Sequence, residues 1–333
     1  WLNNVEQVLD GKMPDYLVIQ HMEPDHSASI PAFLKKYPKV TVVSTAKGFQ
    51  FMEQFFPEFF AGQGLPAEQH IVAANDGVLE LGQHSLHFVY APMVHWPEVM
   101  MTYEATEKIL FAADGFGKFG ALDVEEEWAN EARRYYIGIV GKYGPQVQAV
   151  LKKAAGLDIQ TICSLHGPVL KENLGFYLEK YDRWSSYQPE ESGVVIAYAS
   201  VYGNTRNAAE YLADVLQEKG QKTVLYDLAR CDKAKAVADA FRYDRLVLAG
   251  ITYNGDLFPC MRSFIEGLTE RNYQNRKVAI IENGTWAPMT GKLILGMFEK
   301  SKNLTFTETK VSIKSAMNAQ NKEEIGKLAE ELS

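Results

Sequence analysis

The pattern of apolar and polar residues over the first part of the chain predicts a mixture of helices and short strands. Apolar residues recur at helical spacing near the start, whereas Tyr16–Ile19 is a continuous apolar run with the length of a buried strand. The predicted strands span residues 16–19, 40–43, 71–72, 78–81, 86–90, 108–111 and 159–163, and the predicted helices span residues 1–9, 27–34, 46–56, 125–140, 146–155 and 173–186.

Beyond residue 193, predicted strands and helices alternate strictly. This alternation is typical of a doubly wound parallel sheet, here with five strands. The polar segment 187–193 contains Pro and Gly, so we interpret it as a linker between domains at residues 1–188 and 193–333. The predicted strands span residues 194–198, 222–226, 245–249, 277–281 and 305–311, and the predicted helices span residues 207–219, 260–270, 288–300 and 322–332.

The composition is that of an ordinary globular protein and excludes several functional classes. Of 333 residues, 47% are hydrophobic and 23% are charged. The net charge of −8 argues against nucleic acid as a partner, because nucleic acid attracts clustered Lys and Arg. No apolar run approaches the roughly 20 residues that span a bilayer, and no signal peptide is recognised, so no membrane is expected as a partner.

Two further features concern location and completeness. The three cysteines are odd in number and widely spaced, which predicts a reducing cytoplasm rather than a disulfide framework. The first residue is Trp1, and the first histidine motif comes after only about 20 residues. We therefore expect the numbering to begin inside a longer protein.

Four of the seven histidines lie in short motifs that combine imidazole with carboxylate. Each motif comes after a predicted strand, so we expect all four at one rim of a sheet-containing domain. The motifs are His21-Met22-Glu23-Pro24-Asp25-His26, His95-Trp96-Pro97-Glu98, Asp114-Gly115-Phe116-Gly117 and His166-Gly167-Pro168.

This set of side chains predicts a site for a pair of metal ions. His21, Glu23 and Asp25 have the spacing at which ligands in an extended segment point the same way. The two carboxylates, with Asp114 as a candidate bridge, favour iron or manganese over zinc. Two further imidazoles would complete six protein ligands, His95 and His166. The remaining histidines are interpreted as ordinary surface or core residues, namely His70, His84 and His87.

A different chemistry is predicted for the second domain. The loop Ser200–Thr205 comes after the first strand of that domain and opens a helix, so its backbone N–H groups and hydroxyls can hold a phosphate without Lys. It matches neither a Walker loop nor the dinucleotide pattern G-x-G-x-x-G. Two other loops come after later strands and should meet it at the same sheet edge, Thr252–Gly255 and Glu282–Trp286. Trp286 is a candidate stacking residue, and the alternative is that Tyr253 and Trp286 lie in an interface.

The order of the four metal-type motifs resembles that of the metallo-β-lactamase-like domain of the flavodiiron proteins, and the three later loops resemble those that bind FMN in flavodoxins. The resemblance implies an α/β protein with an αββα sandwich, N-terminal strands apparently missing, followed by a flavodoxin-like five-stranded parallel sheet. It implies that His21, Glu23 and His95 bind one iron. It implies that Asp25 and His166 bind the other, with Asp114 bridging both. The residue matching His26 is generally not a ligand in the family, so His26 is assigned to a supporting position next to the ligands or to proton handling.

For the second domain, the resemblance implies an FMN site. The family often has Ser-Tyr-Gly-Trp in the last loop, where this chain has Asn283-Gly284-Thr285-Trp286. The residues that match the FMN-binding loops are Ser200, Tyr202, Gly203, Asn204, Thr205, Thr252, Tyr253, Asn254, Gly255, Asn283, Gly284, Thr285 and Trp286.

The resemblance also implies a function. Members of the family reduce O2 to water, or two NO to N2O and water, with electrons from a small redox protein, commonly rubredoxin. They assemble as head-to-tail homodimers, so we expect such a dimer, or a tetramer built from it. Two alternatives remain open. One is a zinc-dependent hydrolase fused to a flavodoxin-like module, and the other is an electron-transfer flavodoxin with an inactive first domain.

Overall fold

The computed structural model describes residues 1–60 and 65–333, and these form two compact units. The first unit comprises Trp1–Glu127 with Pro145–Tyr181, and the second comprises Trp128–Gly144 with Asp182–Ser333. Helix α5 (Trp128–Ile139) therefore belongs to the second unit although it precedes the end of the first. The boundaries proposed above, 1–188 and 193–333, stay a prediction.

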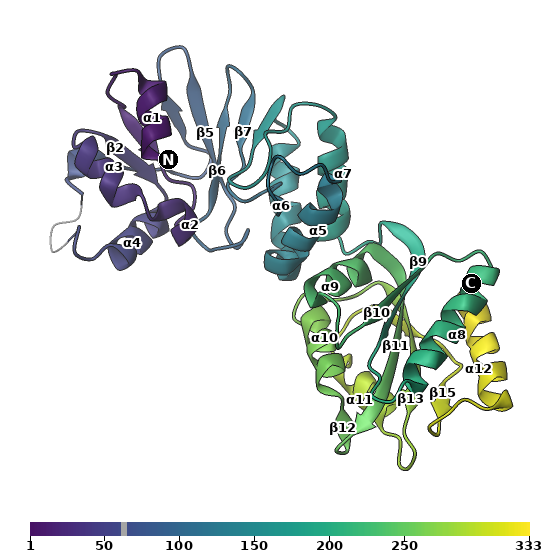
Figure 1. The fold of residues 1–333 in the computed structure, drawn as a ribbon. Helices are drawn as coiled ribbons and strands as arrows, with labels where there is room; N and C mark the ends of the chain where they lie inside the picture. Colours follow the sequence, from purple (N-terminus) through teal and green to yellow (C-terminus); the bar gives the residue numbers. More distant parts are fainter. Residues whose placement is uncertain (61–64) are drawn as a thin grey trace. The chain divides into compact units, whose positions relative to one another are not determined.

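The first unit contains two sheets (Figure 1). In the second of them, β5, β7 and β8 run in the same direction, because β6 is antiparallel to β5 and β7 and because β7 pairs with β8 in parallel. Their carboxyl ends consequently lie at one edge of this sheet. In sheet order, the first sheet holds β1 (Tyr16–Val18), β2 (Thr41–Ser44) and β3 (His70–Val72), and the second holds β4 (Val78–Glu80), β5 (Ser85–Tyr90), β6 (Met100–Glu104), β7 (Ile109–Phe111) and β8 (Thr161–Cys163).

Several helices of the first unit bury apolar side chains against these sheets. One cluster includes Phe33 from α3, Val42 from β2 and Met52 from α4. A second cluster joins the two sheets through Val43 and Phe88. The helices are α1 (Leu2–Leu9), α2 (Pro24–Ser27), α3 (Ile30–Lys36), α4 (Ala46–Phe55), α6 (Gly144–Ala154) and α7 (Leu174–Ser185). The first residue of α6 and the last turn of α7, after Tyr181, belong to the second unit.

The helix predicted to begin at Ser27 is divided in the structure. Ser27 is the last residue of α2, and its hydroxyl donates to the carbonyl of Met22 at 2.9 Å instead of capping a helix. Helix α3 begins only at Ile30, so that Pro31 lies in its first turn, where the missing N–H of proline is tolerated.

The second unit is a parallel sheet in the order β10-β9-β11-β13-β14, which is the flavodoxin-like strand order. Helices α8 and α12 cover one face, and α9, α10 and α11 cover the other (Figure 1). The strands are β9 (Glu191–Tyr198), β10 (Thr223–Asp227), β11 (Tyr243–Tyr253), β12 (Asp256–Leu257), β13 (Arg276–Asn283), β14 (Leu304–Phe306) and β15 (Val311–Ile313). The helices, besides α5, are α8 (Asn204–Glu218), α9 (Lys233–Arg242), α10 (Pro259–Thr269), α11 (Thr290–Met297) and α12 (Ala319–Glu331).

The fifth strand of this sheet, predicted over residues 305–311, is interrupted. Both β14 and β15 pair with β13, but residues 308–310 leave the ladder between them. There the backbone N–H groups of Glu308 and Thr309 each donate at 2.8 Å to the carboxylate of Glu331 in α12. A side chain thus replaces the neighbouring strand as the hydrogen-bond acceptor, which satisfies the backbone without a continuous strand.

Helix α5 is fixed to the second unit by buried polar and aromatic contacts. Arg133 donates to Glu190 at 3.0 Å, and the ring of Trp128 stacks on Trp184 with 5.9 Å between centroids. Among the helices of residues 1–60 and 65–333, none is long and apolar enough to cross a lipid bilayer.

Candidate functional site

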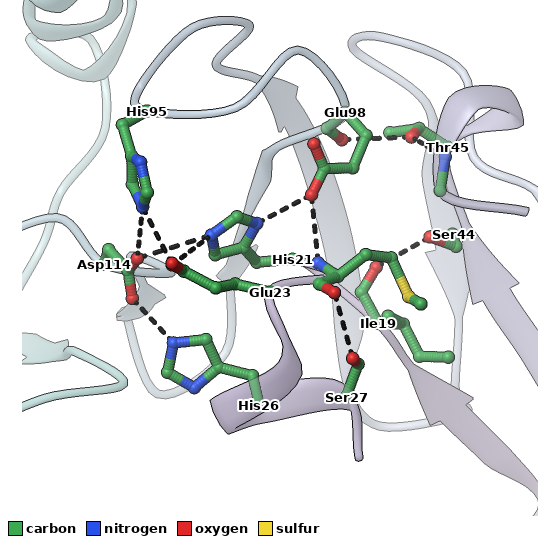
Figure 2. A network of polar contacts seen from close by, with 12 residues as sticks. Ile19, His21, Glu23, His26, Ser27, Ser44, Thr45, His95, Glu98 and Asp114 are labelled. Carbon is green, nitrogen blue, oxygen red and sulfur yellow. Dashed lines mark hydrogen bonds and ion pairs between the residues drawn. The ribbon is translucent and has the colours of Figure 1, made fainter. Parts of the chain in front are cut away.

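Loops at the carboxyl ends of four strands in the first unit bring the predicted metal-binding side chains together. The loop after β1 contributes His21 and Glu23, and the short helix α2, which begins directly after Glu23, contributes Asp25. The three ligands therefore do not share the single extended segment that their spacing predicted. Figure 2 shows His21, Glu23, His95 and Asp114 pointing toward one another. The strand that precedes each ligand is β1 for His21, Glu23 and Asp25, β5 for His95, β7 for Asp114 and β8 for His166.

Four of these residues form a first group of donor atoms. Glu23 Oε2 lies 3.1 Å from His95 Nε2 and 3.3 Å from His21 Nε2. Asp114 Oδ2 lies 3.1 Å from His95 Nε2 and 3.4 Å from His21 Nε2. Atoms that bind one ion at about 2.1 Å lie about 3.0–3.4 Å from one another in octahedral or tetrahedral geometry. The spacing of the first group therefore matches that of ligands around a single ion.

A second group lies on the other side of the same carboxylate and comprises Asp25, His26 and His166. Asp25 Oδ2 is 3.2 Å from His166 Nε2, and Asp114 Oδ1 is 3.0 Å from His26 Nε2 and 3.6 Å from His166 Nε2. Asp114 thus presents Oδ2 to the first group and Oδ1 to the second. This is the arrangement of a carboxylate that bridges two ions.

His26 lies about as close to the carboxylates of Asp25 and Asp114 as the predicted ligand His166 does. Its Nε2 also lies 3.4 Å from Asp25 Oδ2, and its ring centroid is 4.7 Å from that of His166. Its assignment to proton handling stays a prediction. The geometry shows that any proton on His26 Nε2 would lie next to the shared carboxylate.

Buried polar atoms indicate that the donor set fits metal ions. Within the described part of the chain, His21 Nε2, His26 Nε2 and Asp114 Oδ1 are buried and make no hydrogen bond of acceptable geometry, despite the short distance between the last two. A buried polar atom without a partner destabilises the folded protein by about 1–3 kcal/mol. Cations between these nitrogens and oxygens would remove that cost, and the mixture of imidazole and carboxylate suits iron, manganese or zinc.

The charges of the site shift the pKa values of its buried groups. Burial lowers the pKa of His21, but its contacts with Asp114 and Glu98 outweigh burial and raise that pKa to about 9. Burial raises the pKa of Asp114, whereas the surrounding imidazoles of His21, His26 and His95 hold it well below its usual range. Burial likewise raises the pKa of Glu98, and hydrogen bonds from His21 and Met22 hold it below its ordinary value. The site therefore contains ionised carboxylates.

Glu98 is a functional candidate to which the sequence analysis assigned no role. Its Oε1 lies 2.7 Å from His21 Nδ1, on the side of the ring opposite the donor groups (Figure 2). The sequence contained one signal, a carboxylate on the same loop as His95. The contact itself joins residues 77 positions apart and depends on the folding of two loops.

In the second unit, the loops after β9, β11 and β13 line a cavity of about 480 Å³. Of the residues predicted to bind FMN, all but Gly203 line it. Gly203 instead adopts a φ of 89° at the turn into α8, a conformation that favours glycine. The predicted residues that line the cavity are Ser200, Tyr202, Asn204, Thr205, Thr252, Tyr253, Asn254, Gly255, Asn283, Gly284, Thr285 and Trp286. The lining residues that the sequence analysis missed are Val201, Ile251, Ala287, Met289 and Ser315.

The cavity suits a ligand with a phosphate group and an aromatic ring. None of its described lining residues has a charged side chain, so an anion would be held by hydroxyl and N–H groups at the start of α8. Within the described residues, the buried hydroxyl of Ser200 has no hydrogen-bond partner and is free to bind such a group. Tyr202 and Trp286 lie on the cavity lining with 92% and 81% of their surface exposed.

Comparisons with known proteins agree with both halves of this description. The model of the ODP family beta lactamase matches residues 1–167, and that of the flavodoxin domain matches residues 195–311. Diflavin flavoprotein A 1 from Synechocystis sp. is 33% identical over 240 residues, which are 70% of this chain and 40% of that protein. Nitric oxide reductase from Moorella thermoacetica is 27% identical over 281 residues, or 82% of this chain and 68% of that protein.

The solved structure of rubredoxin oxygen:oxidoreductase from the anaerobe Desulfovibrio gigas aligns with 99% of this chain and 82% of that one, at a TM-score of 0.89 and 24% identity. At this identity the likeness shows the fold alone. The chain spans about 40% of the length of the first curated relatives that it matches.

The β-lactamase-like model matches half of the chain, and the flavodoxin model matches the part after it. The chain therefore belongs to the flavodiiron proteins, in which a β-lactamase-like domain precedes a flavodoxin-like domain. The predicted fold class is confirmed by these matches and by the parallel sheet of the second unit.

Metal binding to the metal-free protein should release about one proton from His21 at about pH 8. A histidine of ordinary pKa, about 6.5, is almost wholly neutral there. His21 stays protonated because its pKa is about 9. An ion binds neutral imidazole, so the proton leaves and the apparent affinity increases with pH. Calorimetric Zn²⁺ titrations in two buffers of different ionisation enthalpy measure this proton, and its absence contradicts the raised pKa of His21.

Proposed function

We propose that this protein is an oxidoreductase that reduces O2 to water, NO to N2O, or both, with electrons delivered through FMN to a pair of iron ions. The observation that supports this most strongly is the position of Asp114, whose two oxygens face two separate donor groups. Nitric oxide reduction is named for the Moorella relative, and O2 reduction is implied by the resemblance to the family.

In this proposal each residue of the metal centre has a defined role. His21, Glu23 and His95 hold one ion, Asp25 and His166 hold the other, and Asp114 holds both. The iron pair, when bound, supplies redox and Lewis-acid chemistry for the diatomic substrate. His26 is the proposed proton-handling residue, because its Nε2 lies 3.0 Å from Asp114 Oδ1 and the reduction of O2 or NO consumes protons.

The second unit supplies the electrons in this proposal. Ser200, Thr205 and the N–H groups at the start of α8 hold the phosphate of FMN, while Tyr253 and Trp286 contact its ring. FMN, when bound, passes electrons singly or in pairs. A small redox protein such as rubredoxin is the proposed donor, and the cytoplasm stays the proposed location.

We also infer a head-to-tail homodimer, alone or within a tetramer, in which the FMN of one subunit serves the irons of its partner. The exposed aromatic side chains of Tyr202, Tyr253 and Trp286 support this inference, because exposed aromatic clusters mark interaction surfaces. These three residues line the proposed FMN cavity, and the partner subunit would have to approach this cavity for electron transfer.

The metal centre should contain two iron ions per chain. Asp114→Asn should lower the affinity for both by more than about 100-fold, because it removes the charge of a carboxylate whose two oxygens face both donor groups. Elemental analysis after growth with iron measures the content. Asp158→Asn, which changes an exposed carboxylate, should keep both ions. Two zinc ions and no iron would contradict the proposal and favour the zinc-dependent hydrolase.

FMN affinity should depend on both ends of the cavity. Ser200→Ala should weaken binding about 10- to 100-fold, since a hydrogen bond to a charged group contributes about 1.5–3 kcal/mol. Trp286→Ala should weaken it about threefold to tenfold through lost stacking, and Trp286→Phe less. Flavin fluorescence titration measures these constants, with the exposed Ser312→Ala as control. Unchanged affinity in both the Ser200 and Trp286 variants would contradict the assignment of this cavity.

The dimer can be tested by mixing two variants, one depleted of iron and the other depleted of FMN. Asp114→Asn subunits retain FMN, and subunits with Ser200→Ala and Trp286→Ala retain iron. In a mixed dimer one intact FMN would face one intact metal centre, so NO or O2 consumption should partly return. Mixed dimers without any recovered consumption, or a fully active monomer, would contradict this arrangement.

A further inference from the structure

Glu98 is a buried carboxylate beside the metal centre that is not itself one of the proposed ligands. Only 2% of its surface is exposed. Its Oε1 accepts a hydrogen bond from the backbone N–H of Met22 at 2.9 Å and lies 2.7 Å from His21 Nδ1. Through Oε1, Glu98 of the His95 loop thus contacts two consecutive residues of the loop after β1, His21 and Met22.

This contact determines which nitrogen of His21 is free to bind a metal ion. An ionised carboxylate is only an acceptor, so Nδ1 must carry the proton in the contact with Glu98. The lone pair then lies on Nε2, the atom that faces Glu23 at 3.3 Å and Asp114 at 3.4 Å. Without Glu98, neither the tautomer nor the rotation of the ring would be fixed from this side.

Glu98 is held in turn by the start of helix α4. The hydroxyl of Thr45 donates to the carbonyl of Glu98 at 3.0 Å (Figure 2). The same hydroxyl accepts from the N–H of Gly48 at 3.0 Å. The neighbouring Ser44 donates to the carbonyl of Ile19, just before the His21 loop, at 2.9 Å. Ser44, the last residue of β2, and Thr45, which follows it, therefore make hydrogen bonds to the two loops that meet at His21.

The start of α4 packs closely against Ser44 and Thr45, and a side chain at Gly48 would not fit there. A Cβ atom at Gly48 would lie only 2.3 Å from Ser44 Oγ and 3.3 Å from Thr45 Oγ1.

Within the described residues, Glu98 Oε2 is buried and makes no hydrogen bond. The negative charge of Glu98 is thus balanced mainly through its contacts with His21 and Met22.

We propose that Glu98 is a positioning residue of the metal centre, which fixes the tautomer and orientation of His21 and strengthens metal binding at the first donor group selectively. Among the described residues, Glu98 contacts His21, Met22 and Thr45, and none of these three belongs to the second group of Asp25, His26 and His166. The inference rests on the proposed metal centre, and its distinguishing feature is that the two ions should respond differently.

The test is a Co²⁺ titration of metal-free full-length protein, monitored by absorbance and chelator competition. Glu98→Ala should weaken one of two Co²⁺ sites about 10- to 100-fold and leave the other unchanged. Glu98→Gln should lose less, because its amide oxygen can still accept from Nδ1 and the Met22 N–H. Glu104→Gln is the matched control, since Glu104 is a buried carboxylate bonded to His84 at 3.0 Å outside the site.

A second measurement needs no variant. In the Zn²⁺-loaded wild-type protein, a long-range ¹H–¹⁵N spectrum should show His21 protonated at Nδ1. A proton on Nε2 would overturn the inference, as would two sites that weaken equally in Glu98→Ala or not at all. If the wild type takes up two Co²⁺ ions, these results overturn the inference alone. A wild type that takes up no Co²⁺ overturns the proposed function as well.

Discussion

The rest of the metal centre depends on the contacts between the buried carboxylate of Asp114 and the surrounding imidazoles. It is buried at the end of β7, and each of its oxygens faces imidazole nitrogens from other loops. A buried carboxylate is costly unless positive charge surrounds it, so the loops after β1, β5 and β8 must bring imidazoles or cations to it. This requirement explains why residues from four separate strand ends converge on one point.

In the proposed function, the second unit binds its ligand through interactions of a different kind. Its cavity has no charged side chain among the described lining residues, and the orphaned hydroxyl of Ser200 lies beside the N-terminus of α8. Such a site can bind a phosphate through oriented dipoles, and in the proposed function Trp286 contacts the ring. The metal centre alone would be compatible with hydrolysis. Its combination with a flavin-type cavity favours reduction.

The sequence was most informative where a functional residue comes directly after a buried strand. The positions of His21, Asp114 and the loop at Ser200 were predictable because an apolar run precedes each of them. Contacts between distant segments were not predictable. Glu98 meets His21 only after two loops fold together, and Glu331 interrupts the last strand from a helix more than 20 residues away. The apolar stripe of α5 likewise does not say which unit it will join.

The most direct test of the central claim is NO and O2 consumption by one iron- and FMN-loaded preparation with reduced rubredoxin, while flavin absorbance is recorded. The account predicts rapid consumption of at least one gas, with reduced FMN accumulating when iron is removed or Asp114 is replaced by Asn. Consumption that is unchanged without iron, or a loaded protein that consumes neither gas, would contradict it.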